Sequence, residues 1–120
     1  MPYKVFKESV LRLKSAGGRG IFKNLEDVIE FAKDGIVSKV VAEVAGNEIS
    51  LFCMASGQQL SKHSASFPAV IHVLQGKGEI TLGKEVYEAK PNSWFSLPKE
   101  MPHALKSTEN LVFLLTLFKG

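Results

Sequence analysis

The most constraining feature of the sequence is the regularity with which turn-forming residues interrupt its apolar segments from Ile36 onward. Glycine, proline and asparagine recur every few residues, as in Gly46-Asn47 and Pro91-Asn92. The segments between them are of strand length. We expect strands over residues 36–44, 48–55, 70–74, 79–82, 85–89, 94–97, 103–106 and 111–118. Strands that follow one another without intervening helices predict an all-β sandwich or barrel and exclude a parallel βαβ sheet.

Residues 1–35 lack this regularity. We expect them to form an arm that packs on a barrel of residues 36–120, both within one structural domain, since the chain has 120 residues. Asn24 is suited to cap a short helix over residues 25–33. Four apolar residues would share one face of that helix: Leu25, Val28, Ile29 and Ala32. For residues 5–13 the pattern fits either a short strand or a docked helical turn.

Basic residues are concentrated near the start of the chain. Residues 1–23 carry six Lys or Arg side chains and a single acid, Glu8, whereas the whole chain has a net charge of +3. Such a segment can meet nucleic acid or a membrane surface, or it can be a solvated edge. No recognition helix accompanies the charges. We therefore expect no nucleic-acid partner and no membrane partner.

Cysteine usage and hydropathy bear on the cellular compartment. Cys53 is the single cysteine, which rules out a disulfide within the chain, and its apolar neighbours indicate a buried strand thiol. No signal-peptide pattern opens the sequence, and no apolar segment reaches the length of a membrane span. These features predict a soluble cytoplasmic protein with reduced thiols.

The chain has three histidines, His63, His72 and His103. Neutral imidazole is a common metal ligand near pH 7. His63 lies between two expected strands and His103 opens a later one, so the two side chains can face each other across a barrel. His72 differs, because strand alternation places it on the face opposite to residues 69, 71 and 73. We expect His72 to point outward and to pack against another sheet or subunit.

Three segments resemble the two motifs of a known family. Residues 57–63 (GQQLSKH) and 73–80 (VLQGKGEI) resemble the first motif of the cupins, and residues 91–104 (PNSWFSLPKEMPHA) resemble the second. Their order and strand context identify the chain as a member of the cupin superfamily, a small single-domain cupin. The resemblance implies a double-stranded β-helix, that is, a jelly-roll-like barrel, here preceded by a short helix or an irregular N-terminal segment.

The sequence departs from the family pattern at the metal site. Cupin metal sites generally use two histidines and a glutamate from the first motif and a histidine from the second. His63 and His103 are kept, but the other two positions hold Ala65 and Ala69, which offer no lone pair. Two imidazoles alone are a poor divalent site. A third ligand could come from Glu100, Gln58 or Gln59. At two turns, Asn92 and Glu100 replace motif glycines; asparagine tolerates that conformation, whereas glutamate is harder to explain.

Apolar residues near the motifs are candidates for a ligand pocket. We expect His63 and His103 to line it as polar groups, with three apolar residues in its wall: Met54, Phe67 and Trp94. By strand alternation, Met54 shares its face with Phe52, while Cys53 lies on the other.

Two classes of function remain open. In the first, the barrel binds a small organic molecule without catalysis, which the losses at Ala65 and Ala69 favour. In the second, His63 and His103 hold a divalent metal (Fe, Mn, Ni or Zn) with an unidentified third ligand in a dioxygenase- or isomerase-like enzyme. A third reading, the sensor half of a transcription regulator, is weaker, because the chain has no room for a helix-turn-helix.

We also expect a homodimer. Residues 71–74 and 111–118 are apolar on both strand faces, more than one barrel of this size can bury.

Overall fold

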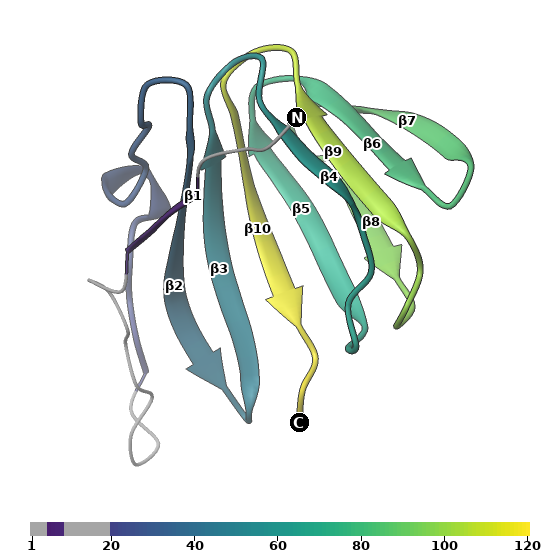
Figure 1. Cartoon of the computed structure of the whole chain (residues 1–120). Helices are drawn as coiled ribbons and strands as arrows, with labels where there is room; N and C mark the ends of the chain where they lie inside the picture. The colour runs from purple at the N-terminus through teal and green to yellow at the C-terminus, as the bar shows by residue number, and fades with distance from the viewer. Residues whose placement is uncertain (1–4, 9–19) are drawn as a thin grey trace.

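A computed structural model describes residues 5–8 and 20–120 of the chain. Within them lie ten strands and one short 3₁₀ helix, η1 (Figure 1). The elements in chain order are β1 (Val5–Glu8), η1 (Leu25–Asp27), β2 (Ile36–Val44), β3 (Asn47–Met54), β4 (Gln59–His63), β5 (Ala69–Gln75), β6 (Gly78–Leu82), β7 (Glu85–Ala89), β8 (Trp94–Leu97), β9 (His103–Ser107) and β10 (Leu111–Leu117). No helix in this part of the chain is long and apolar enough to cross a membrane.

The strands form two sheets that face each other. The larger sheet has the order β1-β2-β3-β10-β5-β8, and the smaller has the order β4-β9-β6-β7. Neighbours in both sheets are antiparallel, except that β1 pairs with β2 in parallel. Sequence neighbours such as β3 and β4 fall in different sheets, as expected for a jelly roll. The predicted all-β, jelly-roll-like architecture is confirmed.

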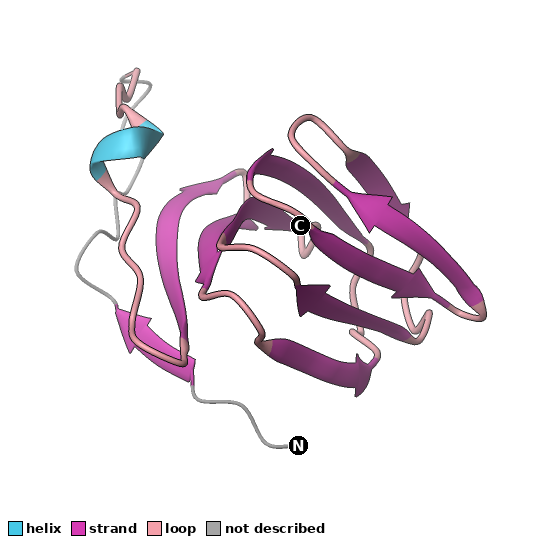
Figure 2. Ribbon diagram, turned by 90° about the horizontal axis from the view of Figure 1, so that it is seen from above, coloured by secondary structure: helices cyan, strands magenta, loops and turns pink. Residues whose placement is uncertain are grey.

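The segment before the barrel differs from the prediction. Asn24 caps a helix as expected, its side-chain oxygen accepting a hydrogen bond from the Glu26 amide at 3.1 Å. The helix, however, ends after Asp27 instead of extending to residue 33, and Figure 2 shows this single turn at one flank of the strands. The apolar residues still pack against the outer face of the larger sheet, with Val28 buried. Tertiary contact therefore sets the backbone here and overrides the helical periodicity.

The open question for residues 5–13 is answered in part. Residues 5–8 form the strand β1, which pairs in parallel with the start of β2. The remainder of that segment, with Val10, Leu11 and Leu13, lies outside the described residues, as do most of the basic residues near the start of the chain.

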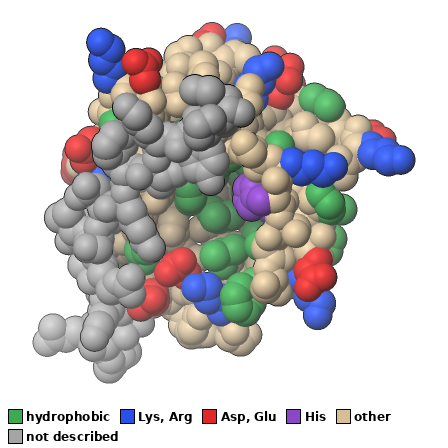
Figure 3. Space-filling model, in the orientation of Figure 1, with side chains coloured by type: hydrophobic (Ala, Val, Ile, Leu, Met, Phe, Trp, Pro, Cys, Tyr) green, Lys and Arg blue, Asp and Glu red, His purple; other side chains and the backbone are tan. Residues whose placement is uncertain are grey.

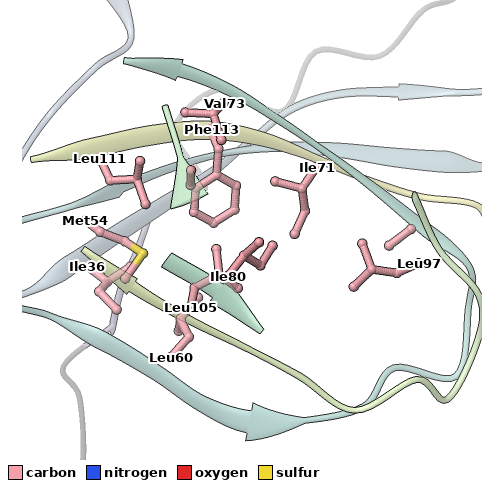
Figure 4. Close-up of a cluster of buried hydrophobic side chains, with 12 residues drawn as sticks. Ile36, Met54, Leu60, Ile71, Val73, Ile80, Leu97, Leu105, Leu111 and Phe113 are labelled. Carbon is pink, nitrogen blue, oxygen red and sulfur yellow. The ribbon is translucent and has the colours of Figure 1, made fainter. Parts of the chain in front are cut away.

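The larger sheet is apolar on both faces. Its inner face forms the main core, where Met54, Ile71 and Val73 meet side chains of the smaller sheet (Figure 4). Its outer face forms a second cluster around Val37, Leu51 and Cys53, covered by the segment that follows Asn24. The alternation predicted for these strands is confirmed, since Met54 lies inside and Cys53 lies outside, and both are buried. Burial raises the pKa of the Cys53 thiol, as befits the structural thiol predicted for it.

Both residues that replace motif glycines adopt the left-handed backbone conformation. Asn92 has a φ of 73° and Glu100 a φ of 65°. The Glu100 amide donates a hydrogen bond of 2.7 Å to the carbonyl of Ala65, which ties the corner before β9 to the loop after β4. The backbone of both motifs is thus retained without glycine, at the conformational cost that a side chain incurs there.

Candidate functional site

A cavity of about 360 Å³ lies between the two sheets. Figure 3 shows a hollow on this side of the molecule, with hydrophobic side chains and a histidine around it. The smaller sheet contributes four residues: Leu60, His63, His103 and Leu105. The larger sheet contributes the other nine: Ser38, Val40, Glu48, Ser50, Phe52, Ile71, Phe113, Leu115 and Leu117. The wall is therefore mainly apolar, with a few polar groups at defined places, as is typical of small-molecule sites.

Strand register arranges the wall of the larger sheet in layers. Phe52 of β3 is opposite Phe113 of β10, Ser50 is opposite Leu115, and Glu48 is opposite Leu117. The Phe52 and Phe113 rings stack at a centroid distance of 5.0 Å. The side chains of β3 in the cavity wall thus become polar toward the start of that strand, while those of β10 stay apolar. At this end of the two strands, Lys119 Nζ lies 3.7 Å from Glu48 Oε1, and both side chains are partly exposed.

The two cavity histidines come from neighbouring strands. His63 at the end of β4 is directly opposite His103 at the start of β9. Leu60 and His63 are three residues apart, yet both line the cavity, because a register shift between them changes the alternation. The imidazole rings lie 4.2 Å apart between centroids and are tilted by 58°.

Each histidine is oriented by its own backbone. His63 Nδ1 lies 2.7 Å from the carbonyl oxygen of Ser61, and His103 Nδ1 lies 3.0 Å from that of Met101. A carbonyl oxygen only accepts, so each Nδ1 must donate its proton, which assigns the Nδ1–H tautomer to the neutral rings. Each Nε2 then carries a lone pair. The hydrogen bonds that the two rings make within the described residues go through Nδ1.

Burial favours the neutral form of His103. The residue is only 7% exposed. This desolvation lowers the pKa of His103, and the neighbouring His63 lowers it further, while the bond to the Met101 carbonyl acts in the opposite direction. His103 is therefore a hydrogen-bond acceptor through Nε2 at neutral pH.

The structure places two of the five residues predicted for the pocket in the cavity wall and the other three elsewhere. His63 and His103 line the cavity. Met54 is fully buried in the core, away from the cavity wall. Phe67 and Trp94 are exposed, Trp94 by 61%, and neither lines the cavity, in contrast to the prediction.

The physical reason for the placement of Trp94 is strand alternation. Trp94 is paired with His72, which lies on the outer face of β5 as predicted, while the buried Ile71 and Leu97 lie inside. Sequence reasoning missed Glu48 and Ser50. They share the parity of Phe52 on β3, so the same alternation could have found them.

The donor set does not fit a resident metal ion. The structure has alanine at 65 and 69, and the part of the chain it describes holds no group of three or more His, Cys, Asp or Glu side chains able to share a metal. Glu100, Gln58 and Gln59, which the sequence left open as third ligands, do not line the cavity. Two imidazoles remain, fewer than the protein ligands of ordinary zinc or non-haem iron sites.

Fold and site together define a small two-sheet barrel with a partly polar cavity between its sheets. The model of the cupin domain family matches residues 50–117, more than half of the chain. The chain therefore belongs to the cupin family.

Solved structures support this assignment. A conserved protein of unknown function from Streptococcus pyogenes is 23% identical, with a TM-score of 0.74 and coverage of 100% of this chain and 96% of that one. An RmlC-like cupin from Desulfovibrio desulfuricans is 26% identical, with a TM-score of 0.74 and coverage of 82% and 96%. A cupin 2 conserved barrel domain protein from Leptotrichia buccalis is 31% identical, with a TM-score of 0.74 and coverage of 81% and 47%. No curated protein matches the chain.

Proposed function

We propose that this cupin binds a small organic molecule in the cavity between its sheets, with His63 and His103 as polar anchors. The cavity of about 360 Å³ is within the range of small-molecule sites. Its apolar wall would hold the body of the ligand, and the stacked Phe52 and Phe113 rings offer a flat surface for it.

The observation that carries the proposal is the state of the two histidines. Each ring is held by its own backbone through Nδ1, which leaves the Nε2 of the neutral ring as a hydrogen-bond acceptor. His103 is largely buried, whereas His63 is exposed, and both line the same cavity. Two acceptors on neighbouring strands that line one cavity are well placed to bind a ligand.

A substitution that fills the cavity with a larger side chain tests this proposal. Leu115 lines the cavity, whereas its neighbour Leu114 packs on the outer face of the same strand, and both are half-buried. Ligand-observed NMR with a library of small fragments should show binding to the wild type and to Leu114→Trp, but not to Leu115→Trp. Fragments that bind all three proteins equally, or none of them, would contradict the proposal.

A metal-dependent, dioxygenase- or isomerase-like enzyme is the second candidate. The observation in its favour is the closeness of two imidazoles with uncommitted Nε2 atoms. The metal (Fe, Mn, Ni or Zn) would need further ligands from outside the described donor set. Elemental analysis of protein purified without chelators or a histidine tag distinguishes the candidates. Stoichiometric metal that is lost in His63→Ala and His103→Ala would favour the enzyme, and metal-free wild type would favour the ligand-binding protein.

We further propose that the chain forms a homodimer through the outer face of β5 and β8. The outward side chains there include Val70, His72 and Trp94, and none of the outward residues of these two strands is Asp, Glu, Lys or Arg. Such a face can meet its own copy across a twofold axis without charge repulsion. Light scattering should give a dimer mass for the wild type and a monomer mass for Trp94→Glu. A wild-type monomer at micromolar concentration would refute the dimer.

A further inference from the structure

The polar groups of the cavity are mostly hydrogen-bond acceptors. In their neutral forms, His63 and His103 present Nε2 lone pairs, because each Nδ1–H donates to a backbone carbonyl. Glu48 presents a carboxylate, and only the hydroxyls of Ser38 and Ser50 can both donate and accept. None of the described residues that line the cavity is Lys or Arg.

A lysine lies beside this set but outside the cavity wall. Lys119 approaches Glu48 at 3.7 Å and is itself partly exposed. An anionic ligand would therefore meet imidazole lone pairs and the Glu48 carboxylate, with no cation among the described lining residues to compensate them.

We propose that the cavity selects molecules whose polar end carries N–H or O–H donors, amines or alcohols, and rejects carboxylates and phosphates. This inference rests on the proposed ligand-binding function and names its substrate class. A donor group at the two imidazoles would satisfy one or both Nε2 atoms. A protonated amine would gain further from Glu48, because a hydrogen bond to a charged group is stronger than one between neutral groups.

The apolar part of such a ligand has an equally defined place. Phe52 and Phe113 stack beneath the cavity, with Ile71, Leu105 and Leu115 also in its wall. A ring joined to a donor by one carbon atom is small enough for a volume of about 360 Å³. Benzylamine, benzyl alcohol, benzoate and toluene form a matched series that varies the polar end while keeping the ring.

NMR titration of the wild type with these four probes at neutral pH tests the inference. We expect benzylamine and benzyl alcohol to bind at least about tenfold more tightly than benzoate, since each donates to an acceptor of the wall, whereas benzoate can accept only from the serine hydroxyls and meets the Glu48 carboxylate. Toluene should be weaker than both donor probes. Benzoate binding as tightly as the donor probes would overturn the inference.

Two variants assign the preference to residues. Glu48→Gln should weaken benzylamine several-fold and leave benzyl alcohol nearly unchanged, whereas Glu79→Gln, an exposed residue of β6, should change neither. His63→Phe keeps an aromatic ring but removes one acceptor, so it should reduce the advantage of benzyl alcohol over toluene. An unchanged advantage in His63→Phe would count against the assigned acceptor.

The failure of this inference is distinguishable from the failure of the proposed function. If Leu115→Trp abolishes binding but benzoate is preferred, the cavity binds ligands and the inferred class is wrong. If the probes bind the wild type and Leu115→Trp equally, or bind neither, the ligand-binding function itself is contradicted.

Discussion

At one end of the space between the two sheets, Ile36, Met54 and Leu111 have no exposed surface. Farther along the same strands, Glu48 of β3 and Leu117 of β10 line the cavity and are only partly buried. Burial decreases along the cross-strand pairs of β3 and β10. The same strands therefore form both a closed apolar core and an open site. This difference separates the residues that stabilise the barrel from those that would bind a ligand.

The closed end is also where backbone approaches backbone most closely. Gly76 has a φ of 88°, and a Cβ atom on it would overlap the carbonyl group of Asn110. Gly78, at the start of β6, has the same relation to the carbonyl oxygen of Lys106. The glycines of the first motif therefore allow the end of β5 to pack against the turn that leads into β10, and β6 to pack against β9.

The largest effect should come from Gly76→Ala, which combines steric overlap with an unfavourable φ. We expect a loss of about 4 kcal/mol or more in the free energy of unfolding, a large fraction of the stability of such a domain. Gly83→Ala is the matched control, because Gly83 also has a positive φ of 62° but open space around it. Its cost should be about 1–2 kcal/mol. Urea denaturation measures both, and equal losses would show that backbone overlap is unimportant at Gly76.

A pair of truncations compares the two ends directly. Ile36→Ala should cost about 2–5 kcal/mol, because it leaves a cavity in a closed core. Leu117→Ala should cost about 1 kcal/mol, since Leu117 is only partly buried and already borders empty space. Chemical denaturation of both variants provides the measurement. If Leu117→Ala were as damaging as Ile36→Ala, the open end would be part of the stabilising core.

Sequence periodicity was sufficient for most of the strands and for the faces of several residues. Alternation placed Ile71 inside and His72 outside, and the turn residues located the strands from β2 to β10 except β4, for which no strand was expected. The length of the helix after Asn24 was not readable, because a periodic apolar pattern does not tell whether the chain packs as a helix or as an irregular segment. The register shift before His63 has no clear sequence signal either, although it turns that side chain toward the cavity.

The site itself could be predicted only in part. The two motifs indicated His63 and His103, but the aromatic character of Trp94 outweighed the alternation that sends it outward beside His72. Glu48 and Ser50 were overlooked because no motif marks β3, where strand parity is the only signal. The tautomers of the histidines depend on carbonyls two residues earlier, and that contact is a property of the folded corner and is not encoded in residue type.

The smallest expected effect is the pH dependence of stability that arises from His103, a residue of the cavity wall. The pKa of His103 is lowered by burial below its ordinary value of 6.5. The unfolded chain therefore takes up the proton first as the pH falls, and His103 makes the folded state less stable below about pH 6.5 than above it. His103→Gln cannot titrate, but it retains the carboxylates that dominate acid unfolding. Urea denaturation from pH 8 to pH 5.5 should show a greater loss of stability in the wild type than in His103→Gln, and parallel curves would mean that His103 is not desolvated in the fold.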